Sequence, residues 1–429
     1  MKVLIVGAGG REHALAWKMA QAGRVSRVYV APGNGGTALE PKVENVPIPV
    51  DAIDRLARFA EDQGVDLTVV GPEAPLVAGI VDAFQKRGLR CFGPTRAAAR
   101  LEGSKAFCKD FMQRHGIPTA AYATFTDPEA AMAYVREQPV PIVVKADGLA
   151  SGKGVVIARS RDEALAAIRA MMAEKAFGEA GSRVVVEEYL QGEEASFMVM
   201  ADGANILPFA SSQDHKPLLD GDRGPNTGGM GAYSPAPVIT AEIHRRILDQ
   251  IIYPTVEGMA GEGTPYTGFL YAGLMITPEG QPKVLEFNCR LGDPETQPLM
   301  MRLRSDLAQL CLAGAEGELA GLGTEWDART ALGVVMAAEG YPGRVRTGDV
   351  IEGLPAGELD DVKVFHAGTR LENGKVVTAG GRVLCVCALG ETVAEAQSRA
   401  YAWVERIHWP GVHYRRDIGW RAVARQRGS

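Results

Sequence analysis

Residues 2–23 of the chain read KVLIVGAGGREHALAWKMAQAG. The apolar run Val3–Val6 leads into a glycine turn, and the pattern that follows over His13–Ala22 is helical. The same alternation continues along the chain, with apolar runs at 28–30 and 67–70 and a helical pattern at 53–63. Apolar runs that alternate with helical segments predict an open parallel β-sheet covered by helices.

The predicted strands end in loops that are rich in glycine and proline, at 7–10, 32–36, 71–73 and 92–94. Open parallel sheets bind their ligands at the carboxyl ends of the strands. We therefore expect a substrate site among these loops.

Two domain boundaries can be placed along the chain. A helical stretch over Ser104–His115 leads into Gly116-Ile117-Pro118, a sequence typical of a domain boundary. Strands and helices then mix to about residue 325, and short strands with one helix close the chain. We expect an N-terminal α/β substrate-binding domain, a central region and a small, mainly β, C-terminal α+β domain, at 1–103, 104–325 and 326–429.

Composition narrows the class of protein. Of the 429 residues, 46% are hydrophobic and 23% are charged, which is typical of a folded globular chain. A net charge of -6 gives no basis for binding a phosphate backbone, so we expect no nucleic-acid partner. The six cysteines lack zinc-site spacing, and no apolar run is long enough to span a membrane. We expect reduced thiols, no membrane partner and a cytoplasmic location.

The first glycine loop, Gly7–Glu12, begins like a dinucleotide-binding fingerprint, but Glu12 replaces its third glycine. The second strand ends in Gly33 and Asn34 without an acidic residue for a ribose, which disfavours NAD. A tight turn without a ligand is one alternative. The favoured interpretation is a phosphate held by backbone N–H groups at a helix N-terminus, as a sugar phosphate would be.

A second glycine-rich loop, Lys145–Gly154, lies between two apolar runs. Its spacing differs from that of a Walker A loop, and Gly154 takes the place of the Mg²⁺-binding Ser or Thr. A hairpin of this kind can close over nucleotide phosphates while Lys145 and Lys153 counter their charge. A plain flexible hairpin is the alternative.

A third motif reads KVLEFNCRLGDPE over 283–295. A carboxylate at Glu286 and an amide at Asn288 offer hard oxygen ligands for Mg²⁺, although a solvated strand face is the alternative. The strand period predicts one polar face of Glu286, Asn288 and Arg290, and one core face of Leu285, Phe287 and Cys289.

The order of these loops resembles that of the ATP-grasp ligases, and longer segments resemble the phosphoribosylamine–glycine ligase (glycinamide ribonucleotide synthetase) family. The segments that carry the resemblance are GAGGREH (7–13), LEGSK (101–105), QDHK (213–216), GPNTGGMGAYSP (224–235), RLGDPE (290–295) and YRRDIG (414–419).

The resemblance implies an N-terminal domain of the pre-ATP-grasp type and a two-lobed ATP-grasp core with a lid lobe at about 120–192. It implies an enzyme of de novo purine biosynthesis that joins glycine to 5-phosphoribosylamine through a glycyl phosphate, with ATP converted to ADP and phosphate. Mg²⁺ or Mn²⁺ would be the cofactor, the partners would be small molecules, and the chain would act as a monomer.

The resemblance also implies the residues of the nucleotide site. Lys105 and Lys145 would contact the phosphates, and Lys153 would be catalytic. Glu187 and Leu190 would lie at the adenine edge, and either Glu193 or Glu194 would hold the ribose. The covering loop would contain Gly148, Gly152 and Gly154, and the metal ligands would be Glu286 and Asn288.

On the substrate side, the resemblance implies that Arg290 binds the glycine carboxylate and that Asp214 receives the glycine ammonium. Asp293 would accept the amine proton or orient Arg290, and the two roles stay open. Two groups of loop residues would bind phosphoribosylamine or the acyl phosphate: Gly9, Gly10, Arg11, Gly33 and Asn34, and Gly228 and Gly229.

Three rival interpretations stay open at this point. An NAD-dependent oxidoreductase would use the N-terminal loop, and a nucleotide sensor would keep the ATP loops without turnover. A different ATP-grasp ligase would use another acid and another amine. The number of metal ions is also open, because the strand Gly268–Met275 lacks the carboxylate that many ATP-grasp enzymes carry there.

Overall fold

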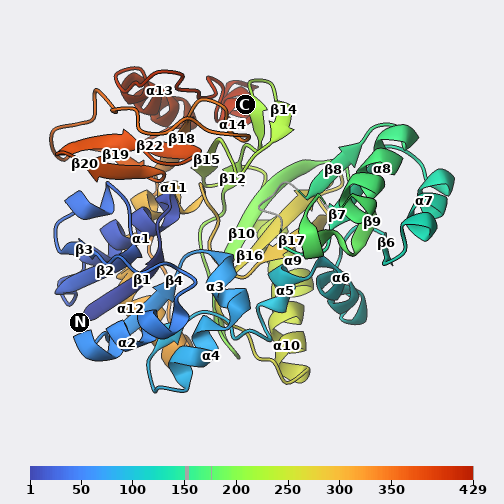
Figure 1. Cartoon of the computed structure of the whole chain (residues 1–429), viewed down its shortest axis with the longest axis horizontal. Helices are drawn as coiled ribbons and strands as arrows, with labels where there is room; N and C mark the ends of the chain where they lie inside the picture. The colour runs from blue at the N-terminus through green and yellow to red at the C-terminus, as the bar shows by residue number, and fades with distance from the viewer. Residues whose placement is uncertain (150–153, 175, 429) are drawn as a thin grey trace.

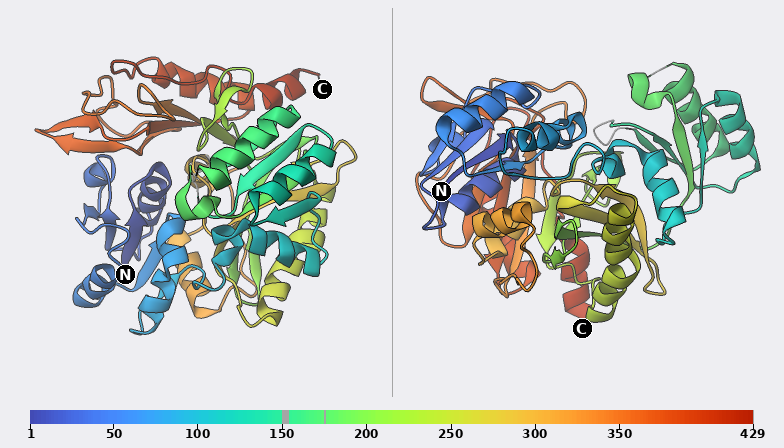
Figure 2. Two further views of the ribbon diagram at one scale, coloured as in Figure 1. Left: turned by 45° about the vertical axis from the view of Figure 1, so that its right-hand side comes forward. Right: turned by 90° about the horizontal axis from the view of Figure 1, so that it is seen from below.

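The computed structural model describes residues 1–149, 154–174 and 176–428. The N-terminal and C-terminal parts lie beside each other, and a lobe that contains β6–β9 projects from the opposite side of a central sheet (Figures 1 and 2). The predicted multidomain α/β and α+β fold is confirmed. Among the described residues, no helix combines the length and apolar character that crossing a membrane requires.

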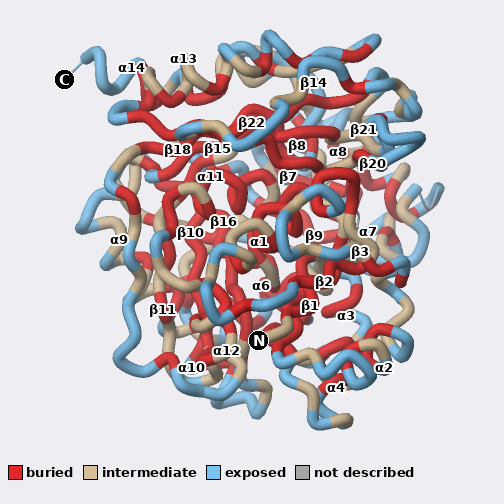
Figure 3. The backbone as a smooth tube through the Cα atoms, turned by 90° about the vertical axis from the view of Figure 1, so that its left-hand side faces the viewer, coloured by how far each residue is buried: buried red, intermediate tan, exposed pale blue. Residues whose placement is uncertain are grey.

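The N-terminal domain is built on a five-stranded parallel sheet in the order β3-β2-β1-β4-β5. The residues of β1 between Val3 and Val6 are fully buried, as Figure 3 shows for this strand. The predicted open parallel sheet is therefore confirmed. Its elements are β1 (Lys2–Gly7), α1 (Gly10–Ala20), β2 (Arg27–Pro32), η1 (Thr37–Leu39), β3 (Val43–Asn45), α2 (Ile53–Gln63), β4 (Leu67–Val70), α3 (Glu73–Ala78), α4 (Ile80–Gln85) and β5 (Cys91–Phe92).

Two helices, α5 (Arg100–Gly103) and α6 (Lys105–Arg114), lead into the projecting lobe. Its four-stranded antiparallel sheet has the order β6-β9-β7-β8, and α7 and α8 pack on it through one apolar cluster. We call this unit the lid lobe. Its elements are β6 (Tyr122–Phe125), α7 (Pro128–Glu137), β7 (Ile142–Ala146), β8 (Val155–Ala158), α8 (Arg161–Ile168), η2 (Arg169–Ala173), η3 (Gly178–Gly181) and β9 (Val184–Glu188).

The central sheet is antiparallel and has the order β11-β10-β16-β17. Two segments connect the lid lobe to the rest of the core: the one that precedes β6 and the one that follows β9 and leads into β10 of this sheet (Figure 1). Its elements and the helices around them are β10 (Glu193–Asp202), β11 (Ile206–Pro208), α9 (Ala241–Ile247), η4 (Leu248–Ile252), α10 (Tyr253–Gly261), β16 (Thr267–Ile276), β17 (Pro282–Asn288), α11 (Thr296–Arg302) and α12 (Leu307–Glu316).

Strict alternation along β17 is interrupted, which corrects one prediction. The register of β17 against β16 shifts after Val284, so Leu285 is an extra residue in a bulge. Val284, Phe287 and Cys289 enter the main core, whereas Leu285 packs in a small separate cluster and lines the central cavity. The prediction that Leu285 faces the core is wrong because the bulge turns it to the other side.

A five-stranded sheet in the order β12-β15-β18-β22-β19 forms the C-terminal part. Two of its strands precede β16 in the chain, so the C-terminal sheet and the central region are interlaced. All six cysteines are free, as predicted, and all are buried. The elements are β12 (Gln213–Asp214), β13 (Pro217–Leu219), β14 (Arg223–Asn226), β15 (Gly231–Ser234), β18 (Thr330–Ala337), β19 (Val362–His366), β20 (Thr369–Glu372), β21 (Lys375–Thr378), β22 (Arg382–Gly390), α13 (Val393–Val404) and α14 (Trp420–Gly428).

Candidate active site

A cavity of about 500 Å³ lies where the lid lobe, the central sheet and the loops of the other two parts meet. Its lining contains residues from nearly every motif that the sequence singles out. The predicted residues in the lining are Arg11, Lys105, Lys145, Gly154, Glu187, Leu190, Glu194, Asp214, Gly228, Glu286, Asn288, Arg290 and Asp293.

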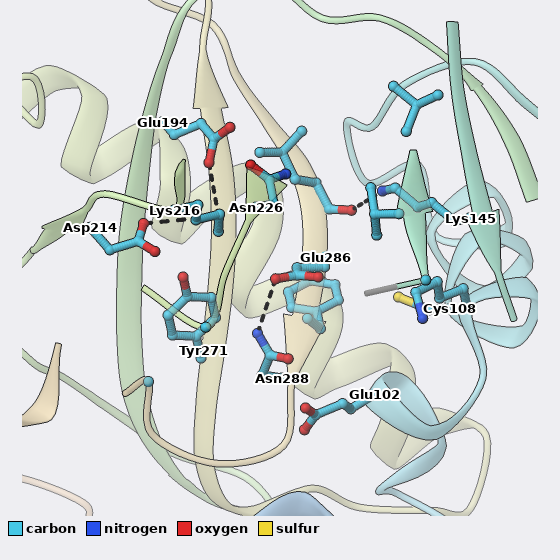
Figure 4. A pocket seen from close by; sticks show the side chains of 18 of the residues that line it. Glu102, Cys108, Lys145, Glu194, Asp214, Lys216, Asn226, Tyr271, Glu286 and Asn288 are labelled. Carbon is cyan, nitrogen blue, oxygen red and sulfur yellow. Dashed lines mark hydrogen bonds and ion pairs between the residues drawn. The ribbon is translucent and has the colours of Figure 1, made fainter. Parts of the chain in front are cut away.

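Glu286 and Asn288 lie side by side on β17 and point into this cavity (Figure 4). Asn288 Nδ2 lies 3.5 Å from Glu286 Oε1. Burial alone would raise the pKa of Glu286, but nearby cations hold this pKa below its usual value, so the carboxylate is ionised at neutral pH. These cations are Lys216, Lys145, Lys105 and Arg290.

The lysines predicted for the nucleotide converge on one end of the cavity. Lys145 Nζ lies 2.9 Å from Glu187 Oε1 and donates to the carbonyl of the bulge residue Leu285 at 3.1 Å. Lys105 Nζ donates to the carbonyl of Gly148 at 3.1 Å, which ties α6 to the glycine-rich loop. Burial lowers the pKa of Lys105, although Glu286 opposes this effect.

A second charged group, to the left of Glu286 in Figure 4, contains Asp214. Lys216 Nζ lies 2.8 Å from Glu194 Oε2 and 3.9 Å from Asp214 Oδ1. Burial raises the pKa of Asp214 to about 7, and Glu295 and Glu194 add to this effect against the opposing charge of Lys216. Asp214 is therefore poised to change its charge near neutral pH.

Arg290 is held between two carboxylates. Its Nη2 donates to Glu102 Oε1 at 2.9 Å, and its Nε donates to Glu73 Oε2 at 3.2 Å. Glu102 also accepts hydrogen bonds from the N–H and the thiol of Cys289, at 2.8 and 3.0 Å. A substrate carboxylate at Arg290 would therefore have to compete with Glu73, the more exposed of the two partners.

Asp293 lies between arginines of the N-terminal and C-terminal parts. Its carboxylate accepts from the Arg11 N–H at 3.3 Å, lies 3.5 Å from Arg382 Nη2 and accepts from Gln297 Nε2 at 2.8 Å. Burial would raise the pKa of Asp293, but Arg382 and Arg11 hold it below its usual value. These contacts favour a permanently ionised Asp293 over one that picks up a proton near neutral pH.

The turn at the start of α1 is filled by a carboxylate. Glu12 Oε2 accepts the Gly9 N–H at 2.6 Å, and a Cβ atom at Gly7 or Gly71 would collide with the Glu12 side chain. Glu12 thus occupies the space that the glycine of a dinucleotide fingerprint would leave open, which disfavours NAD on physical grounds.

The side chain of Asn34 forms hydrogen bonds with backbone groups in the same region. It donates to the carbonyls of Ala8 and His366 at 2.9 and 2.8 Å and accepts from the N–H groups of Gly36 and Thr37. Asn34 thereby joins the N-terminal loop to β19 and has its hydrogen bonds within the protein.

Other predicted residues lie outside the lining of the cavity. Glu193 accepts from Gln213 and pairs with Arg425 of α14, at 2.8 and 2.9 Å. Gly152 and Lys153 fall outside the described residues, so their predicted roles stay predictions. The remaining residues outside the lining are Gly9, Gly10, Gly33, Asn34, Gly148 and Gly229.

The cavity also contains charged and polar residues for which the sequence predicts no role. Glu102, Lys216 and Glu295 belong to segments that carry the family resemblance, so their motifs could have signalled them. Glu73 follows a predicted strand at a candidate binding loop. Tyr271 lies on the strand Gly268–Met275, which the sequence singles out only for the carboxylate that it lacks. Lys109 and Arg382 carry no signal in the sequence, because their place in the cavity depends on packing between distant elements.

Comparison with known families identifies the chain. Three family descriptions of phosphoribosylglycinamide synthetase match it in order: the N domain at 1–102, the ATP-grasp (A) domain at 103–296 and the C domain at 331–421. The chain belongs to the phosphoribosylglycinamide synthetase family. It is therefore a ligase of the ATP-grasp type, and the predicted family is confirmed.

Individual relatives agree with this assignment over their whole length. The phosphoribosylamine–glycine ligase of Escherichia coli O6:H1 is 64% identical over 427 residues, which cover 99% of this chain and all of the relative. That of Pseudomonas aeruginosa is 64% identical over 429 residues, with both chains fully covered. The crystal structure of the Thermotoga maritima phosphoribosylamine–glycine ligase superposes with a TM-score of 0.83 at 36% identity and covers 97% of this chain and 100% of that one.

Proposed function

We propose that this cavity joins glycine to 5-phosphoribosylamine and forms glycinamide ribonucleotide, ADP and phosphate through a glycyl phosphate, as a step of purine biosynthesis. The observation that carries the proposal is the ionised Glu286 beside Asn288, encircled by Lys105, Lys145 and other cations. Phosphoryl transfer needs charge neutralisation and alignment above all, and this set of residues supplies both.

ATP would bind between the lid lobe and the central sheet. Lys105 and Lys145 would contact its phosphates, and the loop from Gly148 to Gly154 would cover them, with Lys153 in a catalytic role. Glu187 and Leu190 would lie at the adenine edge. For the ribose, the position of Glu194 in the lining favours it over Glu193, whose carboxylate is bound to Gln213 and Arg425.

A divalent cation, Mg²⁺ or Mn²⁺, would be held by Glu286 and Asn288. Within the described ranges, no cluster of three or more His, Cys, Asp or Glu side chains could hold a metal by itself. One carboxylate and one amide fit a Mg²⁺ ion that completes its coordination with nucleotide phosphates and water. When bound, the cation would neutralise charge on the phosphates.

The chemistry would take place in two steps. A glycine carboxylate oxygen attacks the γ-phosphorus of ATP, the bond to ADP breaks, and glycyl phosphate forms. The nitrogen of phosphoribosylamine then attacks the carbonyl carbon, loses a proton, and phosphate leaves with the former carboxylate oxygen. The protein has to hold the two substrates in line and exclude water from the acyl phosphate.

Arg290 and Asp214 would hold glycine by its carboxylate and its ammonium. In this arrangement the glycine carboxylate replaces Glu73 on the Arg290 guanidinium, while the buried pair with Glu102 persists. An ammonium beside Asp214 favours the ionised form of its carboxyl group and so lowers the pKa that burial has raised.

Phosphoribosylamine would bind near Arg11 and the loop that contains Gly228 and Gly229, with support from Gly9, Gly10 and Gly33. Of the two roles left open for Asp293, its low pKa disfavours that of proton acceptor. The other role, orienting Arg290, would have to be indirect, because the contacts of the Asp293 carboxylate are with Arg11, Arg382 and Gln297. Action as a monomer, a cytoplasmic location and the absence of a nucleic-acid partner stay predictions from composition and family.

Phosphate release tests the proposed function. ATP, Mg²⁺, glycine and phosphoribosylamine generated in situ are combined, and each substrate is then left out in turn. Release that requires both glycine and the amine supports the ligase. Phosphate release with a different acid or amine, but not with these two, would contradict it.

A further inference from the structure

A buried lysine without a role in the proposed reaction lies under the nucleotide end of the cavity. Lys109 is on α6, one turn after Lys105, and is only 2% exposed. Its Nζ lies 3.0 Å from Glu187 Oε2 and donates to Thr119 Oγ1 at 2.7 Å. An ammonium group loses its hydration when it is buried, so Lys109 can stay charged here only because these partners replace the lost water.

Glu187 is shared between two lysines, one on each carboxylate oxygen. Its other oxygen, Oε1, lies 2.9 Å from Lys145 Nζ. In the lid sheet, Val143 of β7 is opposite Glu187 of β9, so Lys145 is its diagonal neighbour on the same face. The sheet register therefore fixes Lys145 beside Glu187, and α6 brings Lys109 to the remaining oxygen.

Both lysines are tied to the strand that carries the proposed metal ligands. Lys145 donates to the carbonyl of Leu285, the bulge residue directly before Glu286. Lys109 acts through Thr119, whose hydroxyl donates to the carbonyl of Val284 at 2.6 Å. The row Lys109–Glu187–Lys145 thus joins the lid lobe to β17 next to Glu286.

We propose that Lys109 is a positioning residue for the phosphate end of the nucleotide and acts through Glu187 and Lys145. By pairing with one oxygen of Glu187, Lys109 keeps this carboxylate from neutralising Lys145 completely. Lys145 then presents its charge and remaining N–H bonds to the phosphates at a fixed place beside Glu286. This inference rests on the proposed function, in which Lys145 contacts ATP phosphates.

A charge count makes the proposal specific. Two lysines and one carboxylate leave this row with one net positive charge, and Lys109→Met removes it. Lys109→Met with Glu187→Gln restores one net positive charge, now on Lys145 alone. The Lys109→Met step removes one charge in either background, but only with a carboxylate at Glu187 does it leave Lys145 neutralised. Loss of Lys109 should therefore weaken phosphate binding strongly when Glu187 is a carboxylate and weakly when it is an amide.

The test is a calorimetric binding series with ATP, ADP and adenosine in the presence of Mg²⁺. It uses the full-length protein and the variants Lys109→Met, Lys109→Arg, Glu187→Gln and Lys109→Met/Glu187→Gln. Lys86→Met, a change at an exposed lysine, is the matched control. Thermal unfolding checks that each variant is folded, and Lys109→Gln, which keeps a polar group beside Thr119, replaces Lys109→Met if that variant is not.

We expect Lys109→Met to weaken ATP and ADP at least tenfold and adenosine less than threefold, because adenosine has no phosphates. Lys109→Arg should stay within threefold of the wild type. In the Glu187→Gln background, the Lys109→Met step should cost less than threefold for ATP.

Equal weakening of ATP and adenosine would overturn the inference, because Lys109 would then be a structural residue of the nucleobase wall. An unchanged ATP affinity in Lys109→Met, or the same loss in both backgrounds, would also overturn it. If the wild type itself binds neither ATP nor ADP, the proposed function fails, and that result is distinct from a failure of the role of Lys109.

Discussion

Arg290 Nη2 donates to Glu102 Oε1 across 2.9 Å, and both side chains lie inside the protein, with 17% and 7% of their surfaces exposed. The pair joins the loop after β17 to α5, the short helix that precedes Lys105 of α6. Glu73, at the start of α3, adds a second carboxylate to the same guanidinium. Arg290 therefore links the N-terminal domain, the entry to the ATP-grasp core and the strand of Glu286.

Removal of Arg290 should reduce stability as well as activity. Arg290→Ala leaves Glu102 buried without its counter-charge, and breaking a buried pair in this way costs roughly 3–5 kcal/mol. Urea unfolding should show this loss in the free energy of unfolding. The double variant Arg290→Ala/Glu102→Gln should recover part of it, and a loss below about 1 kcal/mol in the single variant would show that the pair is not buried as described.

Glu286→Gln should separate metal-dependent from metal-independent nucleotide binding. The change keeps the shape of the side chain but removes its negative charge. In the wild type, the surrounding cations keep this carboxylate ionised. We expect ATP affinity with Mg²⁺ to fall at least tenfold, with little change in the presence of a chelator, and turnover to fall by about a hundredfold or more. Calorimetry and phosphate release measure the two effects, and equal losses with and without Mg²⁺ would exclude Glu286 as a metal ligand.

Glycine binding should depend on pH through Asp214. Its pKa is raised to about 7, so the carboxyl group gains a proton as the pH falls through neutrality and can no longer pair with an ammonium. The KM for glycine should therefore rise several-fold between pH 8 and pH 6. In Asp214→Asn this KM should be higher throughout and nearly independent of pH, whereas an unchanged pH profile in the variant would assign the titration to another group.

The contacts between the N-terminal loop and β19 should contribute less to the stability of the fold in mild acid. Burial lowers the pKa of His366 to about 3, with His13 and Lys363 adding to the effect and Glu40 opposing it. A histidine with a lowered pKa contributes stability that is complete above its unfolded pKa of about 6.5 and is lost as the pH falls towards the folded value.

His366→Gln should remove this pH dependence. Between pH 7 and pH 5, where the unfolded chain takes up the proton, the wild type should lose roughly 2 kcal/mol more than the variant. Chemical unfolding at the two pH values measures the difference. Parallel losses in the two proteins would mean that His366 is protonated in the folded state.

Local pattern predicted the N-terminal parallel sheet, the hairpin β7–β8 and the strand of Glu286 and Asn288, because each is encoded within a short window of sequence. The bulge at Leu285 has no such local signal, since it depends on the register of β17 against β16. A period-two pattern carries no information about a neighbouring strand.

Long-range partners explain the other omissions. Arg382 reaches the cavity from the first residue of β22 and donates to the carbonyl of Asp293, 89 positions earlier in the chain, at 2.7 Å. Glu73 meets Arg290, 217 positions later in the chain, only because the start of α3 lies beside the loop after β17. Neither contact has a local signal in the sequence. The pairing of Arg290 with two carboxylates and the ionised state of Asp293 could therefore be seen only in the structure.

Transfer of oxygen from glycine to phosphate tests the proposed glycyl phosphate most directly. Glycine labelled with ¹⁸O in both carboxylate positions is incubated with the protein, ATP, Mg²⁺ and phosphoribosylamine, and the released phosphate is examined by mass spectrometry. If the carboxylate attacks the γ-phosphorus, each phosphate released with product carries one ¹⁸O atom. Unlabelled phosphate formed in step with glycinamide ribonucleotide would contradict an acyl phosphate at this site.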